Sequence, residues 1–412
     1  MNYDYHQEAL QVIADLHELR TLTADAEGSH RVAWTPVWDQ ALEWFSDKMR
    51  SLGADVSIDS AHNVYACIPG ETSEALCIGS HLDSVPGGGW LDGALGVVAG
   101  IGIARHLQGK TPSKTLYIVS WADEEGARFG RSCVGSAAIS GALVPAEVAD
   151  LKDRTGMTFR EALTRYGMTP ERMTQAHEEF VEKHIRQYLE LHIEQAPVLE
   201  SRGLSAAAVT GICGCEREYI TFQGQRSHLG CPGSMRHDAF LAAAEAALAF
   251  RQIAERYTTD EAYAYCTVGE VIVSPNVINV VPDNCILSLD MRTLDETTLQ
   301  RMKQEAHDAC KAIAAKNGVQ VTFETIWQIP PTHFDPSLIQ LCQTSLEKEG
   351  CPPSVIVSGP LHDAAELAKC VPSAMMFIRS SNGLSHCKEE DTPEHDLSIG
   401  IAAFMRLVDA LI

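Results

Sequence analysis

One stretch of the chain carries the residue types that bind divalent cations. His81 is followed eleven residues later by Asp92, and the acidic pair Glu124 and Glu125 follows after a further apolar run. Divalent cations of hard or borderline character take carboxylate oxygen and imidazole nitrogen as ligands. These residues therefore indicate half of a two-metal hydrolase site.

The chemistry of each group suggests its role in such a site. A carboxylate has two oxygens and can bridge two ions, which makes Asp92 the candidate bridging ligand. Asp83, two residues after His81, is placed to accept the other imidazole N–H and so to support catalysis by fixing the tautomer. The side chains of Glu124 and Glu125 point in different directions, so one can bind a metal while the other acts as general base.

The elements that position these residues predict an open α/β sheet. Residues 75–78 form a short apolar run that is typical of a buried parallel strand, and Gly79 ends it. Residues 91–107 have helical spacing with Asp92 at the N-cap, and residues 115–121 predict a strand that ends at the acidic cluster. Ligands bind outside the carboxyl ends of such strands, so the imidazole and the acidic residues are expected to converge there.

The order of helix and strand patterns predicts one discontinuous domain with an insertion. Residues 1–208 and 327–412 are expected to form a doubly wound α/β catalytic domain, with a long helical stretch at 170–188. Residues 209–326 predict an inserted α+β domain with a four-stranded sheet covered by two helices. Strands are expected at 219–223, 264–273, 285–292, 319–325, 354–357 and 374–378, and helices at 237–257 and 295–317.

Composition limits the classes of partner. The chain has 412 residues, 45% of them apolar, and a formal net charge of −23. Such a length and composition suit a soluble protein of two or three domains. The negative charge argues against nucleic acid and anionic membranes as partners. Acidic residues and histidine interrupt the apolar residues of 1–18, which predicts neither a signal peptide nor an anchor, and no apolar run reaches membrane-spanning length.

The cysteines favour a reducing compartment. There are thirteen, scattered without paired spacing, which suits free thiols and a cytoplasmic location. Cys213 and Cys215 could form a thiolate site with Cys231. No fourth ligand is spaced for zinc, so small residues on a strand are the favoured interpretation.

Five segments match the motifs and spacing of a known family. They are residues 79–92, 124–129 (Glu-Glu-Gly-Ala-Arg-Phe), 191–200 (Leu-His-Ile-Glu-Gln-Ala-Pro-Val-Leu-Glu), 275–292 and 383–386. From Trp34 to the C-terminus the chain resembles the amidase, hydantoinase/carbamoylase branch of the M20 metallopeptidase clan. This branch includes N-carbamoyl-L-amino acid hydrolases, yeast-type β-ureidopropionase and allantoate amidohydrolase.

The resemblance implies two divalent metal ions per subunit. His192 points to this branch in particular, because aminopeptidases and carboxypeptidases of the clan usually have an acidic residue at that position. Zinc is the expected metal, and manganese, cobalt and nickel are alternatives that the same ligand types accept. The implied ligands are His81 and His192 for one ion, Glu125 and His386 for the other, and Asp92 between them, with Glu124 as catalytic base.

The resemblance also implies contacts to a substrate that bears a carboxylate, which suits the two-pronged guanidinium of an arginine. His228 would help to stabilise the developing oxyanion. With Asn279 it would reach the site of a partner subunit, so the insertion is expected to serve as dimerisation and lid domain of a homodimer. The implied substrate-binding residues are Gln195, Arg217, His228, Asn279, Arg292 and Gly359.

The chain departs from the family pattern near these expected contacts. The loop 229–235 after His228 is one residue shorter than usual, and residues 215–216 are Cys-Glu where Gln and a basic or bulky residue are commoner. Residues 360–361 are Pro-Leu where Ala-Gly is usual, which affects a backbone donor expected near Gly359. The metal ligands show no such departure, so the departures bear on specificity.

The expected function is hydrolysis of the carbamoyl C–N bond of N-carbamoyl-L-amino acids or related ureido acids, with release of ammonia and carbon dioxide. Glu124 would take a proton from the attacking water and deliver it to the leaving nitrogen. Allantoate and ureidoglycolate are rival substrates. An N-acyl amino acid hydrolase or dipeptidase is a second alternative, against which His192 stands. A non-catalytic binding protein is a third, disfavoured because Glu124 and every ligand are present.

Overall fold

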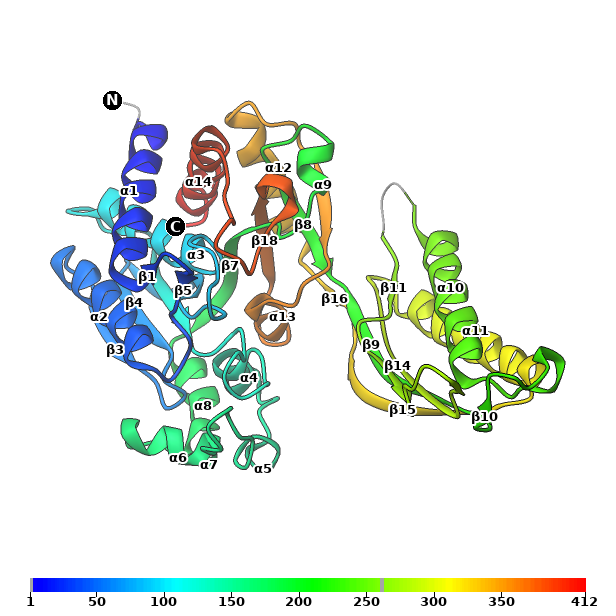
Figure 1. Ribbon diagram of the computed structural model, residues 1–412. Coiled ribbons are helices and arrows are strands. Elements are labelled where there is room, and N and C mark those ends of the chain that lie inside the picture. Colours follow the sequence, from blue (N-terminus) through cyan, green and yellow to red (C-terminus); the bar gives the residue numbers. More distant parts are fainter. Residues whose placement is uncertain (1–2, 260–262) are drawn as a thin grey trace. The chain divides into compact units, whose positions relative to one another are not determined.

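The computed structural model (Figure 1) describes residues 3–259 and 263–412. The chain divides into two compact units. The first comprises Met1–Thr210, Phe334–Ile356 and Leu361–Ile412, and the second comprises Gly211–His333 and Val357–Pro360. The chain thus leaves the first unit, forms the second and returns. Within the described residues, no helix is long and apolar enough to cross a membrane.

A mixed sheet forms the centre of the first unit. Its strands lie in the order β16-β8-β18-β7-β5-β6-β4-β3, with the short edge strand β16 (Thr332–His333) at one end, and β17 also pairs with β8. The central strands β18, β7, β5 and β6 are parallel, so their carboxyl ends meet at one edge, whereas β8, β4 and β3 are antiparallel to their neighbours. The strands are β3 (Asp55–Ile58), β4 (Val64–Ile68), β5 (Thr72–His81), β6 (Lys114–Trp121), β7 (Ile185–Ile193), β8 (Ala206–Ile212), β17 (Val355–Ser358) and β18 (Ser373–Ile378), besides the short pair β1 (Ala24–Asp25) and β2 (Gly28–Ser29).

Helices cover both faces of this sheet. Ile378 of β18 packs against Gly400 of α14, whereas its neighbour Phe377 packs on His362, which precedes α13. Figure 1 shows α1, α3 and α14 together, with α4, α8 and α13 on the other side of the sheet. The helices are α1 (Tyr5–Thr23), α2 (Pro36–Ser51), α3 (Ala94–Leu107), α4 (Val134–Ser140), α5 (Pro145–Val148), α6 (Phe159–Leu163), α7 (Pro170–Met173), α8 (Ala176–Glu182), α9 (Val198–Ser201), α12 (Pro336–Lys348), α13 (Asp363–Leu367) and α14 (Glu394–Asp409).

The second unit is an antiparallel sheet with two helices on one face. Along β14 every second residue is buried, as expected for a strand with one covered and one open face. Phe222, Leu289 and Met291 of the sheet form a core with Phe250 and Met302 of the helices. The elements are β9 (Gly214–Gln223), β10 (Ser227–His228), β11 (Tyr265–Thr267), β12 (Val271–Ser274), β13 (Val280–Val281), β14 (Asn284–Thr293), β15 (Gln320–Ile329), β16 (Thr332–His333), α10 (Ala239–Tyr257) and α11 (Glu296–Asn317).

The predicted fold class, an α/β sheet with a separate α+β unit, is confirmed. The sheet of the second unit is four strands wide, in the order β11-β14-β9-β15. The expected strand at 264–273 is divided into β11 and β12, which both pair with β14, so the sheet contains five strands. The expected helix at 170–188 is too long. Only α7 and α8 are helical, and the chain from Ile185 onward forms β7, because pairing with β5 and β18 outweighs local helical preference.

Two expectations about the site elements are also corrected. Gly79 does not end its strand, since β5 continues to His81. Asp92 does not cap α3, because the N-cap is Gly93, with a φ of 64° and no side-chain cap. Asp92 is thereby free to direct its carboxylate toward other groups.

Candidate metal centre

Two imidazoles with the same tautomer lie at the carboxyl end of the parallel strands. The Nδ1 atom of His81 is 3.1 Å from the carbonyl oxygen of Asp83, and Nδ1 of His192 is 2.9 Å from that of Ile193. Each ring therefore donates its Nδ1–H to a carbonyl, so that the ring, when neutral, has its lone pair on Nε2. The amide N–H of Gly93 donates to Nε2 of His192 over 3.2 Å, which agrees with this assignment.

Gly93 gives the His81 ring its space. A Cβ atom at this position would lie 2.3 Å from that ring, and the backbone φ of 64° also favours glycine. Any larger residue would displace the imidazole or the start of α3. The sequence Asp92-Gly93 thus places a carboxylate beside an imidazole at the head of a helix.

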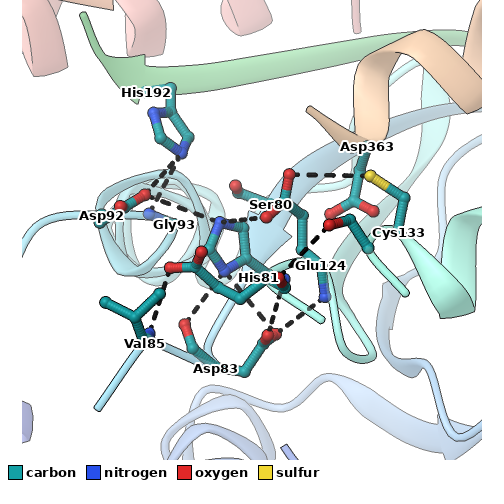
Figure 2. Close-up of polar contacts among 12 residues, drawn as sticks. Ser80, His81, Asp83, Val85, Asp92, Gly93, Glu124, Cys133, His192 and Asp363 are labelled. Atoms are coloured by element: carbon teal, nitrogen blue, oxygen red, sulfur yellow. Dashed lines mark hydrogen bonds and ion pairs between the residues drawn. The ribbon is translucent and has the colours of Figure 1, made fainter. Parts of the chain in front are cut away.

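Asp92 faces three imidazoles, two of which are labelled in Figure 2. Its Oδ1 atom is 3.2 Å from Nε2 of His192 and 3.8 Å from Nε2 of His81. Its Oδ2 atom is 3.2 Å from Nε2 of His386 and accepts a hydrogen bond of 2.9 Å from Nε2 of Gln195. Burial alone would raise the pKa of Asp92, but its contacts with His192 and His386 hold that pKa well below its usual value. The predicted bridging carboxylate is therefore ionised and central.

His386 joins the site from the segment of the chain that returns to the first unit. Its Nε2 atom lies 3.3 Å from Oε2 of Glu125 and 3.3 Å from Nε2 of Gln195. His386 and Gln195 have φ angles of 58° and 59°, in the left-handed region. Such conformations cost roughly 1 kcal/mol or more and are concentrated at functional sites. The strain is thus located where the loop meets Asp92 and Glu125.

The side chains form two triads that fit divalent cations. Nε2 of His81 is buried, with no hydrogen-bond partner in the described part of the chain, and burial lowers the pKa of His81 to about 3, so a neutral ring presents its lone pair. Burial, followed by the charge of Asp92, raises the pKa of Glu125 well above its usual value, as expected for crowded carboxylates without a counter-charge. Potential ligand atoms within each triad lie within 4.8 Å of one another, and the triads are His81, Asp92, His192 and Asp92, Glu125, His386.

The two adjacent glutamates are directed to different neighbours. Glu125 belongs to a triad, whereas Oε2 of Glu124 lies 3.7 Å from Nε2 of His81 and its Oε1 lies 3.7 Å from Sγ of Cys133. Burial, followed by the charge of Asp363, raises the pKa of Glu124 well above its usual value. A carboxyl group with a raised pKa is suited to exchanging protons near neutrality. This arrangement favours Glu125 as ligand and Glu124 as base.

Asp83 acts differently from the sequence expectation. Its backbone carbonyl, not its carboxylate, is the hydrogen-bond acceptor for His81, and the carboxylate Oδ1 is 3.7 Å from Nδ1. The carboxylate instead accepts the backbone N–H groups of Glu124 and Glu125, at 3.3 and 3.0 Å. Asp83 therefore connects the end of β5 to the segment that carries both glutamates.

Five of the predicted substrate-binding residues belong to the second unit. Three of them, Arg217, Arg292 and Gly359, lie together: the two arginines share the carboxylate of Asp290, and Nη1 of Arg292 donates to the carbonyl oxygen of Gly359. Gly359 thus presents an acceptor here, where the sequence analysis expected a backbone donor.

The other two residues lie at the short two-stranded sheet of β10 and β13: His228 ends β10, and Asn279 directly precedes β13. His228 is exposed on β10, and the carbonyl of Asn279 accepts the backbone N–H of Leu229 at 3.3 Å. Gln195 alone of the predicted substrate-binding residues lies in the first unit, with its amide on Asp92.

Several buried polar residues around the centre were not identified from the sequence. Glu390 accepts the backbone N–H groups of Leu91 and Asp92 and the hydroxyl of Ser385. Arg31, fully buried, donates to the carbonyl of Leu82 between His81 and Asp83. No sequence signal marks either residue, since each acts through the distant segment it contacts.

A third group of possible ligands, Glu190, His192 and His362, shares His192 with the first triad.

Comparisons with known proteins agree with one another. The family model described as peptidase family M20/M25/M40 matches residues 77–410. The chain is 33% identical over 378 residues to an N-carbamoyl-L-amino acid amidohydrolase of Geobacillus stearothermophilus, covering 90% of this chain and 91% of that protein. It is 31% identical over 382 residues to an allantoate amidohydrolase of Escherichia coli (strain K12), covering 91% of each.

A solved structure extends this likeness to the whole fold. The amidase of the hydantoinase/carbamoylase family from Burkholderia multivorans matches with a TM-score of 0.89 at 29% identity. The match covers 98% of this chain and 97% of that one, so both units are included.

Proposed function

Because the chain belongs to peptidase family M20/M25/M40 and is a metal-dependent amidohydrolase acting on C–N bonds other than peptide bonds, we propose that it hydrolyses N-carbamoyl-L-amino acids. The bond cleaved would be the carbamoyl C–N bond, and the products would be the amino acid, ammonia and carbon dioxide. The resemblance to the hydantoinase/carbamoylase branch is confirmed by these comparisons.

The observation that carries the proposal is the position of Asp92 between the imidazoles of His81, His192 and His386. This carboxylate belongs to both triads and is the natural bridge between two cations. Divalent ions held there would lower the pKa of a water molecule and polarise the substrate carbonyl. The proposed ligands are His81 and His192 for one ion, Glu125 and His386 for the other, and Asp92 for both.

We assign the proton transfers to Glu124. Its buried carboxylate lies beside His81 and outside both triads, so an oxygen atom is available for a proton. It would accept a proton from the water that attacks the carbamoyl carbon and then donate that proton to the leaving nitrogen. Asp83 would hold Glu124 in place through the backbone N–H.

The choice of acyl group rests on the names of the relatives, and His192 argues against an N-acyl amino acid as substrate. The two relatives described above act, by their names, on N-carbamoyl-L-amino acids and on allantoate, at nearly equal identity. Both names describe ureido compounds, and the slightly higher identity is to the first. Allantoate or ureidoglycolate is therefore our second candidate, and an N-acyl amino acid is the third.

A substrate panel tests the proposal. We expect the metal-loaded protein to release ammonia from at least one N-carbamoyl-L-amino acid faster than from allantoate or ureidoglycolate. N-formyl and N-acetyl amino acids should release no formate or acetate. Protein treated with a chelator is the matched control. The proposal would be contradicted if N-acetyl amino acids released acetate while no ureido compound released ammonia. Release of ammonia from allantoate alone would favour the second candidate.

We further propose that the second unit forms a homodimer through α10 and the loop that carries Asn279. Phe240, Leu241 and Leu248 lie on the face of α10 away from its buried alanines and are 47%, 50% and 56% exposed. Ile278, beside Asn279, is 96% exposed. Three exposed apolar side chains on one helix favour burial against another protein surface, and Ile278 adds an exposed apolar side chain beside Asn279. In this dimer His228 and Asn279 would contact substrate bound by the partner subunit.

A charged substitution on α10 tests the dimer. We expect Leu248→Glu to raise the dimer dissociation constant about 100-fold or more, because each copy would bury an unpaired carboxylate. Light scattering after size-exclusion chromatography measures the effect. Ile58→Glu is the matched control, since Ile58 is a similarly exposed residue of the first unit, at 57%. A monomeric wild-type protein, or equal effects of both variants, would refute the proposed interface.

A further inference from the structure

The open face of the sheet in the second unit carries a compact polar cluster. Along β14 the half-buried residues that alternate with the core include Asp290 and Arg292. In the antiparallel register of β9 and β14, Asp290 pairs with Arg217 and Arg292 pairs with Cys215. Arg217 and Arg292 are therefore diagonal neighbours on one face, with Cβ atoms roughly 7 Å apart.

Asp290 holds both arginines in fixed positions. Its Oδ1 accepts Nε–H of Arg292 at 2.8 Å, and its Oδ2 accepts Nη2–H of Arg292 at 3.1 Å and Nε–H of Arg217 at 2.6 Å. Burial alone would raise the pKa of Asp290, but the two guanidinium groups hold it below its usual value. The carboxylate is thus charged, and one negative group serves two positive ones.

The two arginines keep different donors for a ligand. Arg292 uses Nε and Nη2 on Asp290 and Nη1 on the carbonyl of Gly359, so two of its five N–H groups remain. Arg217 uses only Nε, and within residues 3–259 and 263–412 no acceptor lies on its Nη atoms. Its guanidinium lies over the ring of Trp327, 5.0 Å from the centroid, and the side chain is 41% exposed. Arg217 is therefore oriented from two sides with both amino groups available.

We propose that Arg217 determines specificity by binding an oxygen acceptor on the side chain of the substrate, next to a carboxylate bound by Arg292. This inference rests on the proposed function, from which the carboxylate on Arg292 is taken. A guanidinium already fixed by Asp290 and Trp327 loses little conformational freedom when it binds. The cluster has an excess of one positive charge in a chain whose net charge is −23, which favours an electron-rich partner.

The acceptor can come from two kinds of substrate. One is a carboxylate, as in N-carbamoyl-L-aspartate, and the other is the oxygen of a second ureido group, as in allantoate. An aliphatic side chain, as in N-carbamoyl-L-leucine, would leave the Nη groups of Arg217 without a partner. The same chemistry therefore predicts that at least one of the two acceptor substrates ranks above the aliphatic one.

The test compares kcat/KM for these three substrates in the wild type and in Arg217→Gln. We expect the wild type to favour at least one acceptor substrate over N-carbamoyl-L-leucine. Arg217→Gln should reduce that ratio about 10- to 100-fold, mainly through KM, because a charge-assisted hydrogen bond is lost. The substrate whose ratio falls identifies the acceptor. A wild type that prefers the leucine compound, or a ratio unchanged in Arg217→Gln, would overturn the inference.

Two further variants separate specificity from folding. Arg217→Lys keeps the positive charge but loses the planar pair of donors, so part of the preference should return. Arg256→Gln removes an exposed arginine of the same unit that pairs with Glu305, and it should leave the ratio unchanged. An equal loss in all three variants would assign the effect to the stability of the unit and refute the role of Arg217. If no ureido compound yields ammonia, the proposed function fails instead.

Discussion

Glu124→Gln is expected to lower kcat about 10²- to 10⁴-fold, the range for loss of a general acid–base group, while KM changes little. The amide keeps the size of the side chain but cannot accept a proton from water. Because Glu124 lies outside both triads, the variant should retain its full metal content. Steady-state assays together with metal analysis of the purified protein measure both quantities.

The matched control for this prediction is Glu347→Gln. Glu347 is exposed on α12, so the same chemical change should leave kcat within about twofold of the wild type. Turnover of Glu124→Gln near the wild-type rate, with metals still bound, would exclude Glu124 as the base. A large loss of metal in Glu124→Gln would instead mark this residue as a ligand.

Removal of the metal ions should reduce activity at least about 10³-fold, since Glu124 would then have to take a proton from a water molecule whose pKa no cation lowers. We also expect the metal-free protein to unfold at a lower temperature. Binding of an ion at 100 times its dissociation constant stabilises the folded state by about 2.7 kcal/mol. The buried carboxylates of Glu124 and Glu125 would lose the counter-charge that offsets their mutual repulsion.

Dialysis against a chelator, followed by addition of zinc, manganese, cobalt or nickel one at a time, measures this effect and identifies the metal that restores activity. Magnesium serves as control, because it prefers an octahedral set of oxygen ligands and binds imidazole poorly. Full activity after verified removal of all metal would contradict the assignment of the centre.

The residues that local pattern and chemistry could identify are those at the ends of elements. His81 and the Glu124-Glu125 pair follow apolar runs, and Asp92 lies at the start of one. The residue types indicate cation binding without knowledge of the fold. His192 could not be identified in this way, because a histidine between Leu191 and Ile193 has the pattern of a core residue. Only the resemblance to a family marked it as a ligand.

Interactions between segments that are distant in the chain could not be predicted from the sequence. The bonds from Glu390 to the backbone of Leu91 and Asp92 join residues 299 and 298 positions apart. In the sequence, Asp290 is one acidic residue of a predicted strand and carries no special signal. Its hydrogen bonds to both Arg217 and Arg292 depend on the register of β9 and β14. The role of Asp83 was misassigned for a related reason: backbone geometry, which decides whether a carbonyl or a carboxylate meets His81, is not encoded in residue type.

The return of the chain to the first unit has a consequence for biosynthesis. During translation, residues up to 193 can pair β5 with β7 and bring His81, Asp92 and His192 together. His386 follows only after the whole second unit has been made, because it lies in the segment Leu361–Ile412. A nascent chain thus passes through a long interval in which it holds four of the five ligands of the proposed bimetallic site, and His386 arrives near the end of synthesis.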